Sequence, residues 1–130
     1  MLRNAMILGV LAGVFAGGHA ATWQAVYTAP TGTIWIDRDT LSVEPPLVYV
    51  RLRISLAKPS NPGDVFYDRR DVRLIFQCAT WQYSMISDTK WLHGKLMKRW
   101  EGDTEYVDLD PDSLWSEAAK TLCKQTSLRR

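Results

Sequence analysis

The segment Asp110–Cys123, which reads DPDSLWSEAAKTLC, is the clearest helix signal in the chain and ends at one of only two cysteines. Asp110 suits the N-cap, and Pro111 fits the first helical position, where a backbone N–H has no partner. Helical spacing places four apolar side chains on one arc, which predicts a buried face: Leu114, Trp115, Ala118 and Leu122. The rest of the chain must therefore supply an apolar surface for this helix and, beside it, a partner for Cys123.

The first twenty residues have the pattern of a cleaved secretory signal. They contain Arg3, an uncharged run from Ala5 to Gly18, and small residues at the two positions that a signal peptidase reads. A membrane anchor is the weaker alternative, because the run is shorter than the roughly 20 residues that span hydrocarbon. We expect a signal peptide over residues 1–20, a single domain over residues 21–130, and no membrane span after cleavage. No cysteine lies near the cleavage position, so we expect a periplasmic or secreted protein without a lipid anchor.

The charge balance names no partner. Without Arg3, 15 Lys and Arg stand against 14 Asp and Glu, a net charge of +1 over 110 residues. Nucleic-acid binders usually carry a basic excess, and proteins of membrane surfaces a basic amphipathic helix. We therefore expect no nucleic-acid partner.

The two cysteines predict a disulfide. In an oxidising compartment two cysteines are more often bridged than catalytic or metal-binding. Cys78 is the partner that the chain offers to Cys123. A bridge enclosing about 46 residues would stabilise the fold by roughly 4 kcal/mol in the loop-entropy model.

Alternating apolar and polar residues predict strands in the middle of the chain. Val48–Leu56 alternates over nine residues, which indicates a sheet with one buried and one wet face. The same period in Val65–Cys78 puts Cys78 on the face that carries Val72 and Phe76. A helix packed on that face of the sheet could reach Cys78.

Further strands surround these two. We expect a loop over Lys58–Asp64, a turn near Asp88 and a bulge at Gly94. The additional strands are predicted over Thr22–Thr28, Thr33–Asp37, Trp81–Ser87 and Lys90–Trp100. Consecutive strands with tight turns predict an α+β domain, in which one C-terminal helix closes an antiparallel meander.

One set of residues is a candidate binding surface. Arginines on the outward positions of two strands, with aromatic residues alongside, have the composition of interface hot spots. The candidate residues are Tyr49, Arg51, Arg53, Arg73 and Trp91. The alternative is a solvated sheet face on which the arginines pair with carboxylates such as Asp71.

Catalysis and metal binding have weak support. His93 is the only histidine outside the signal peptide, and it has no Cys, Asp or Glu at ligand spacing. An acidic run lacks the spacing of an EF-hand: Asp103, Glu105, Asp108, Asp110 and Asp112. We expect no enzyme activity, no metal site and no cofactor.

The order of several features resembles the surface-adhesin protein E family of Gram-negative bacteria. These features are Trp23 at the mature start, Ile36-Asp37 before Thr40-Leu41-Ser42, a strand ending in Cys78, and Pro111-x-Ser113 before a helix ending in Cys123. The resemblance implies a small α+β domain with about six antiparallel strands, a C-terminal helix across one face, and a disulfide between helix and sheet. The founding member is an outer-membrane lipoprotein that binds host matrix and serum proteins and self-associates. This chain departs from it in lacking a lipobox cysteine.

The expected function is therefore binding. We expect an exported, non-enzymatic, adhesin-like interaction module whose partner is a host-matrix or envelope protein, with a homodimer through a sheet face or edge as a further expectation. The alternative is a periplasmic inhibitor or envelope-maintenance protein that acts on a cell-wall enzyme.

Overall fold

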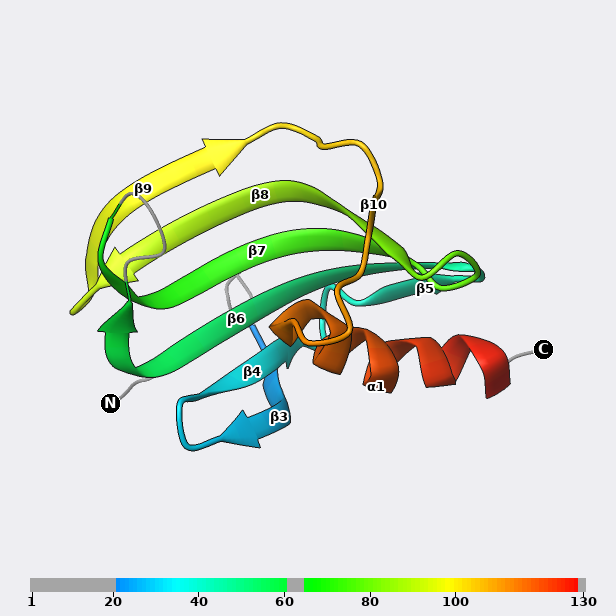
Figure 1. Cartoon of the computed structure of the whole chain (residues 1–130), viewed down its shortest axis with the longest axis horizontal. Coiled ribbons are helices and arrows are strands. Elements are labelled where there is room, and N and C mark those ends of the chain that lie inside the picture. Colours follow the sequence, from blue (N-terminus) through cyan, green and yellow to red (C-terminus); the bar gives the residue numbers. More distant parts are fainter. Residues whose placement is uncertain (1–20, 61–64, 129–130) are drawn as a thin grey trace, which may run out of the picture.

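The protein is one curved antiparallel sheet with a helix on one face (Figure 1). The computed structural model describes residues 21–60 and 65–128. The elements in chain order are β3 (Trp23–Ala29), β4 (Gly32–Asp37), β5 (Ser42–Glu44), β6 (Leu47–Ser60), β7 (Tyr67–Gln77), β8 (Gln82–Leu92), β9 (Lys95–Glu101), β10 (Val107–Asp108) and α1 (Leu114–Leu128).

Strands that follow one another in the chain lie next to one another in most of the sheet. The strand order is β10-β8-β7-β6-β4-β3, with β5 beside β6 and β9 beside β8, and every pair is antiparallel. The long strands β6, β7 and β8 lie side by side in Figure 1. The predicted α+β meander is confirmed.

The core lies between the sheet and α1. In β6 the apolar positions are buried and the intervening ones only partly covered, as the period of two requires. The buried positions of β6 pair with buried positions of β7: Leu74 lies opposite Val50, and Val72 lies opposite Leu52. Ala118 is fully buried against this surface, and its small side chain lets the helix approach the sheet closely.

The Cys78–Cys123 disulfide joins the end of β7 to α1. The two Cα atoms are 5.6 Å apart, and neither cysteine is free. The predicted bridge is confirmed, and so is its position on the sheet face that carries Val72 and Phe76.

The start of the helix differs from the prediction. α1 begins at Leu114, and Ser113 rather than Asp110 caps it, because the Ser113 Oγ accepts the N–H of Ser116 at 3.2 Å. Asp110 instead closes the preceding turn by accepting the N–H of Asp112 at 3.0 Å. The predicted buried arc was also rotated: Leu114 is 40% exposed, whereas Ser116 is 1% exposed. The buried face extends from Ala118 and Leu122 toward Cys123, the side on which the disulfide joins the helix to the sheet.

The predicted turn near Asp88 was wrong. β8 runs unbroken through Asp88, and the chain reverses at His93 and Gly94, which have φ angles of 51° and 82°. Gly94 is thus part of a hairpin turn rather than a bulge, because left-handed backbone is what a two-residue hairpin needs. The loop expected from Lys58 also begins later, since β6 continues to Ser60, and residues 61–64 lie outside the described residues.

Over residues 21–60 and 65–128, no helix combines the length and apolar character that crossing a membrane requires. The predicted signal peptide lies outside the described residues.

Candidate functional site: an arginine-rich sheet face

The face of the sheet opposite α1, here called the outer face, is lined by charged and aromatic side chains. Cross-strand register puts Arg51 opposite Arg73 and Arg53 opposite Asp71 on β6 and β7. The same rows continue into β8 and β9: Asp71 lies opposite Thr89, Arg73 opposite Ser87, Thr89 opposite Arg99, and Ser87 opposite Glu101. Because directly opposed residues share a face, four strands contribute to one polar surface.

Asp71 holds two of these arginines in place. Arg53 donates to both carboxylate oxygens of Asp71, with an Nε–Oδ1 distance of 2.9 Å and an Nη2–Oδ2 distance of 3.1 Å. Arg51 forms a longer ion pair with the same carboxylate, 3.8 Å from Nη2 to Oδ2. Such a bidentate arginine–carboxylate pair fixes geometry as well as charge.

A tryptophan from the first strand completes this arrangement. The guanidinium carbon of Arg53 lies 4.2 Å from the centre of a Trp23 ring, and that of Arg51 lies 5.1 Å away. Cation–π contacts at these distances are favourable and restrict the arginine side chains further. Arg51 also pairs at 3.7 Å with Asp37, a buried residue that accepts from the N–H of Asp39 and the hydroxyl of Thr40.

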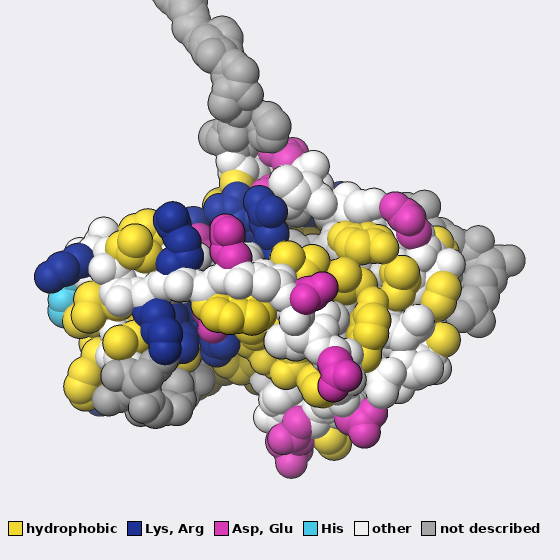
Figure 2. Space-filling model, turned by 90° about the horizontal axis from the view of Figure 1, so that it is seen from above, with side chains coloured by type: hydrophobic (Ala, Val, Ile, Leu, Met, Phe, Trp, Pro, Cys, Tyr) yellow, Lys and Arg dark blue, Asp and Glu magenta, His cyan; other side chains and the backbone are white. Residues whose placement is uncertain are grey.

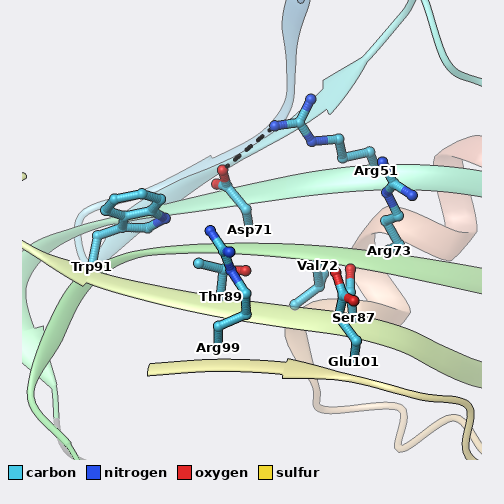
Figure 3. Close-up of a pocket in the computed structure, with 9 residues that line it drawn as sticks. All are labelled: Arg51, Asp71, Val72, Arg73, Ser87, Thr89, Trp91, Arg99 and Glu101. Carbon is cyan, nitrogen blue, oxygen red and sulfur yellow. Dashed lines mark ion pairs between the residues drawn. The ribbon is translucent and has the colours of Figure 1, made fainter. Parts of the chain in front are cut away.

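A cleft of about 300 Å³ opens beside this fixed cluster (Figure 3). We call it the outer cleft, and its polar lining includes Arg51, Asp71, Arg73, Thr89, Trp91 and Arg99. Arg73 and Arg99 are exposed, and neither forms a hydrogen bond or ion pair within the described part of the chain. Two kinds of arginine thus lie in and beside the outer cleft: Arg51 and Arg53 are held by Asp71, whereas Arg73 and Arg99 have no partner among residues 21–60 and 65–128.

Trp91 contributes an unused donor to the outer cleft. Its indole Nε1 is buried and meets no hydrogen-bond acceptor among the described residues. In Figure 3 this nitrogen lies at the end of the ring that points toward Asp71, Thr89 and Arg99. The Arg69 guanidinium stacks on the Trp91 ring at 4.7 Å and limits its movement.

The sheet edge at β9 presents many cations. Figure 2 looks onto this edge and shows dark-blue basic side chains gathered on both sides of a band of pale backbone, with fewer magenta acidic ones among them. Lys98 and Arg99 are neighbours on β9, so their side chains point to opposite faces of the sheet. The cations of this edge are therefore divided between two surfaces.

A second charged cluster lies on the helix side of the sheet. Arg70 donates to both oxygens of Asp88 at 2.9 and 2.8 Å and stacks on the Trp115 ring at 5.2 Å. Burial alone would lower the pKa of Arg70, but the hydrogen bond and charge of Asp88, with a contribution from Tyr67, raise it above its usual value. Arg70 therefore stays charged where it packs on Trp115, beside the start of α1.

Comparison with solved structures connects the fold to known proteins. One structure of Haemophilus influenzae protein E, in its second crystal form, superposes with a TM-score of 0.54 at 15% identity and covers 84% of this chain and 99% of that one. The fold is protein E-like. A second, of protein E from non-typeable H. influenzae, gives a TM-score of 0.53 at 15% identity and covers 87% of this chain and 84% of that one. The sequence matches no protein-family model and no curated protein.

Within this protein E-like fold, all five candidate binding residues are in or beside the outer face. Arg51, Arg73 and Trp91 line the outer cleft, and Arg53 is held next to it. Tyr49 lines an adjacent cleft of about 310 Å³ together with Arg51 and Arg73. The structure thus brings these five residues together on one side of the sheet.

Sequence reasoning missed several members of this surface. Arg99 and Thr89 were not placed because the predicted turn near Asp88 gave β8 and β9 the wrong register. Even with β8 unbroken, a regular hairpin at His93-Gly94 would have paired Thr89 with Lys98, and only the register shift between Lys90 and Trp91 puts Thr89 opposite Arg99. Trp23 could not have been placed over Arg53 without the position of β3.

The remaining candidates lie elsewhere. His93 is exposed in the β8–β9 turn, where its backbone N–H donates to Asp68 and its Nε2 is 3.8 Å from the Asp68 carboxylate. In residues 21–60 and 65–128, no group of three or more His, Cys, Asp or Glu side chains is arranged to hold a metal ion.

Proposed function

We propose that this protein is an exported, non-enzymatic, adhesin-like binding module of the bacterial envelope that contacts a protein partner through its outer face. The observation that carries the proposal is the difference between the two sheet faces. α1 covers one face and builds the core, whereas the other presents arginines and aromatic residues around an open cleft.

The composition of the outer face supports protein binding. Arginine and tryptophan are enriched among residues that dominate binding energy in protein interfaces. Arg51 and Arg53 are already held by Asp71 and Trp23, so they would lose little conformational freedom on binding. A surface ordered before binding avoids part of the entropy cost of association.

The protein E-like fold supports the class of function more broadly. The resemblance noted in the sequence is to a family of surface adhesins, and the fold agrees with it. Because the identity is only 15%, the partner is to be sought among both host-matrix and envelope proteins.

Site-specific photo-crosslinking in the source cells tests the proposal. A photoreactive amino acid replaces Ser87, which lines the outer cleft, in one variant and Lys124, exposed on α1, in the control variant. We expect a discrete crosslinked protein from position 87 and none from position 124. Equal products from both positions, or none from position 87, would contradict the proposal.

The identity of the crosslinked protein distinguishes three possible functions of the binding module. A host-matrix protein would support an adhesin, and a second copy of this chain would support the homodimer. A cell-wall enzyme would support the alternative of a periplasmic inhibitor or envelope-maintenance protein.

A further inference from the structure

Several hydrogen-bond donors converge on the outer cleft without acceptors of their own. Arg73 and Arg99 line it from β7 and β9, and neither has a partner within residues 21–60 and 65–128. The buried Nε1 of Trp91 and the hydroxyl of Thr89 line the cleft from β8, the strand between β7 and β9, and both lie close to Arg99 in Figure 3. A buried N–H without an acceptor is unfavourable, so this cleft is suited to a ligand that brings acceptors.

The charge of the lining limits the ligand to a small negative charge. Three arginines, Arg51, Arg73 and Arg99, stand against two carboxylates, Asp71 and Glu101, which leaves a net charge of +1. Asp71 is already engaged by Arg51, so the free pair of arginines faces only Glu101. A monovalent anion neutralises this lining, whereas a doubly charged phosphate would leave one negative charge uncompensated and would cost more to desolvate.

We propose that the outer cleft binds a carboxylate side chain, Asp or Glu, from an acidic segment of the protein partner. This inference rests on the proposed function and adds the chemistry of the partner to it. A carboxylate has two oxygens in a plane, which match the paired N–H groups of a guanidinium. When the carboxylate binds Arg99, one carboxylate oxygen can also accept a hydrogen bond from the indole N–H of Trp91.

The indole N–H of Trp91 is a local reporter of the ligand. Uniformly ¹⁵N-labelled residues 21–130 are titrated with an acetylated and amidated peptide, Gly-Glu-Gly-Glu-Gly, and separately with its Gln analogue. The Trp91→Phe variant assigns the indole signal. We expect the glutamate peptide to shift this signal in a saturable way and the glutamine peptide to leave it unchanged.

Variants connect the shift to the cleft. Arg73→Gln with Arg99→Gln should weaken the binding of the glutamate peptide by about tenfold or more, since each removes a charge-assisted hydrogen bond. Lys124→Gln, which removes an exposed cation from α1, should leave binding unchanged. A dispersed ¹⁵N spectrum of each variant shows that it is folded.

Three results would overturn the carboxylate proposal. These are equal shifts with the glutamine peptide, a Trp91 signal that does not respond to the glutamate peptide, and tighter binding of inorganic phosphate than of the peptide at equal ionic strength. If a protein crosslinks at position 87 while the Trp91 signal is silent, only the carboxylate inference fails. If the Trp91 signal responds and no protein crosslinks, the proposed protein partner fails.

Discussion

Arg53 and Asp71 face each other across β6 and β7 and form two hydrogen bonds, with the ring of Trp23 stacked on the guanidinium at 4.2 Å. Three strands are thereby connected on the outer face by side chains as well as by backbone. Arg53 therefore helps to hold the sheet together. Arg73 and Arg99 are available to a ligand, because neither has a partner within the described residues.

The Arg53–Asp71 pair should contribute measurably to stability. In a double-mutant cycle with Arg53→Gln and Asp71→Asn, we expect a coupling free energy of about 1–2 kcal/mol, because both side chains are mostly buried and the pair is bidentate. Urea unfolding measures it. The exposed Lys120–Glu117 pair on α1 is the matched control and should give less than about 0.5 kcal/mol. Equal coupling energies would show that Arg53 has no special structural role.

The disulfide should be a large part of the stability of the domain. Cys78 and Cys123 are 45 residues apart, so replacing both with Ala should lower the free energy of unfolding by about 4 kcal/mol. Chemical denaturation of residues 21–130 with and without a reductant measures the same difference on the unchanged sequence. A loss below about 1 kcal/mol would contradict this prediction and show that the cross-link restrains the unfolded chain little.

The helix cap can be tested by two substitutions. Ser113→Ala should destabilise the protein by about 1 kcal/mol, because the N–H of Ser116 loses its acceptor. Asp110→Ala should cost less, since it removes an acceptor only from the exposed turn before α1. Thermal unfolding of both variants shows which substitution destabilises the protein more. A larger loss with Asp110→Ala would show that Asp110 is the cap.

Much of the fold followed from patterns in the sequence because those patterns depend on burial alone. The period of two in β6 and β7 predicted both strands and the face that contacts α1, and it placed Cys78 where a helix could reach it. The disulfide followed because the chain offers a single pairing of Cys78 with Cys123.

Features that depend on tertiary contacts were harder to predict. Asp88 looks like a turn residue, but its carboxylate is held by Arg70 and the strand continues through it. The apolar side chains of α1 alone did not show that its buried face extends toward Cys123, so that Ser116 is buried while Leu114 is exposed. The outer arginines were recognised one strand at a time, whereas the outer cleft depends on the register of four strands.

Gly32 marks a position at which two strands approach closely. A Cβ at this position would collide with the backbone oxygen of Ser55 on β6. We expect Gly32→Ala to destabilise the protein by about 2 kcal/mol, because the clash is with backbone and cannot be relieved by a side-chain rotation. Urea unfolding measures the effect. Gly94 is the control, since a Cβ there meets no atom within 4 Å and the cost comes only from its φ of 82°, about 1 kcal/mol.

The most direct test of the outer face is a binding assay with charge-reversed arginines. Arg73→Glu with Arg99→Glu is the informative variant, because Arg53→Glu would place two carboxylates side by side at Asp71 and destabilise the fold. The matched control is Lys124→Glu on α1. Both variants should keep the melting temperature within about 3 °C of the parent.

The assay uses the partner identified by crosslinking and measures its dissociation constant for each variant by a calorimetric titration. We predict that Arg73→Glu with Arg99→Glu weakens binding by about a hundredfold or more while Lys124→Glu leaves it unchanged. Undiminished binding by the folded double variant would contradict the account, since the outer face would then not be the surface that the partner contacts.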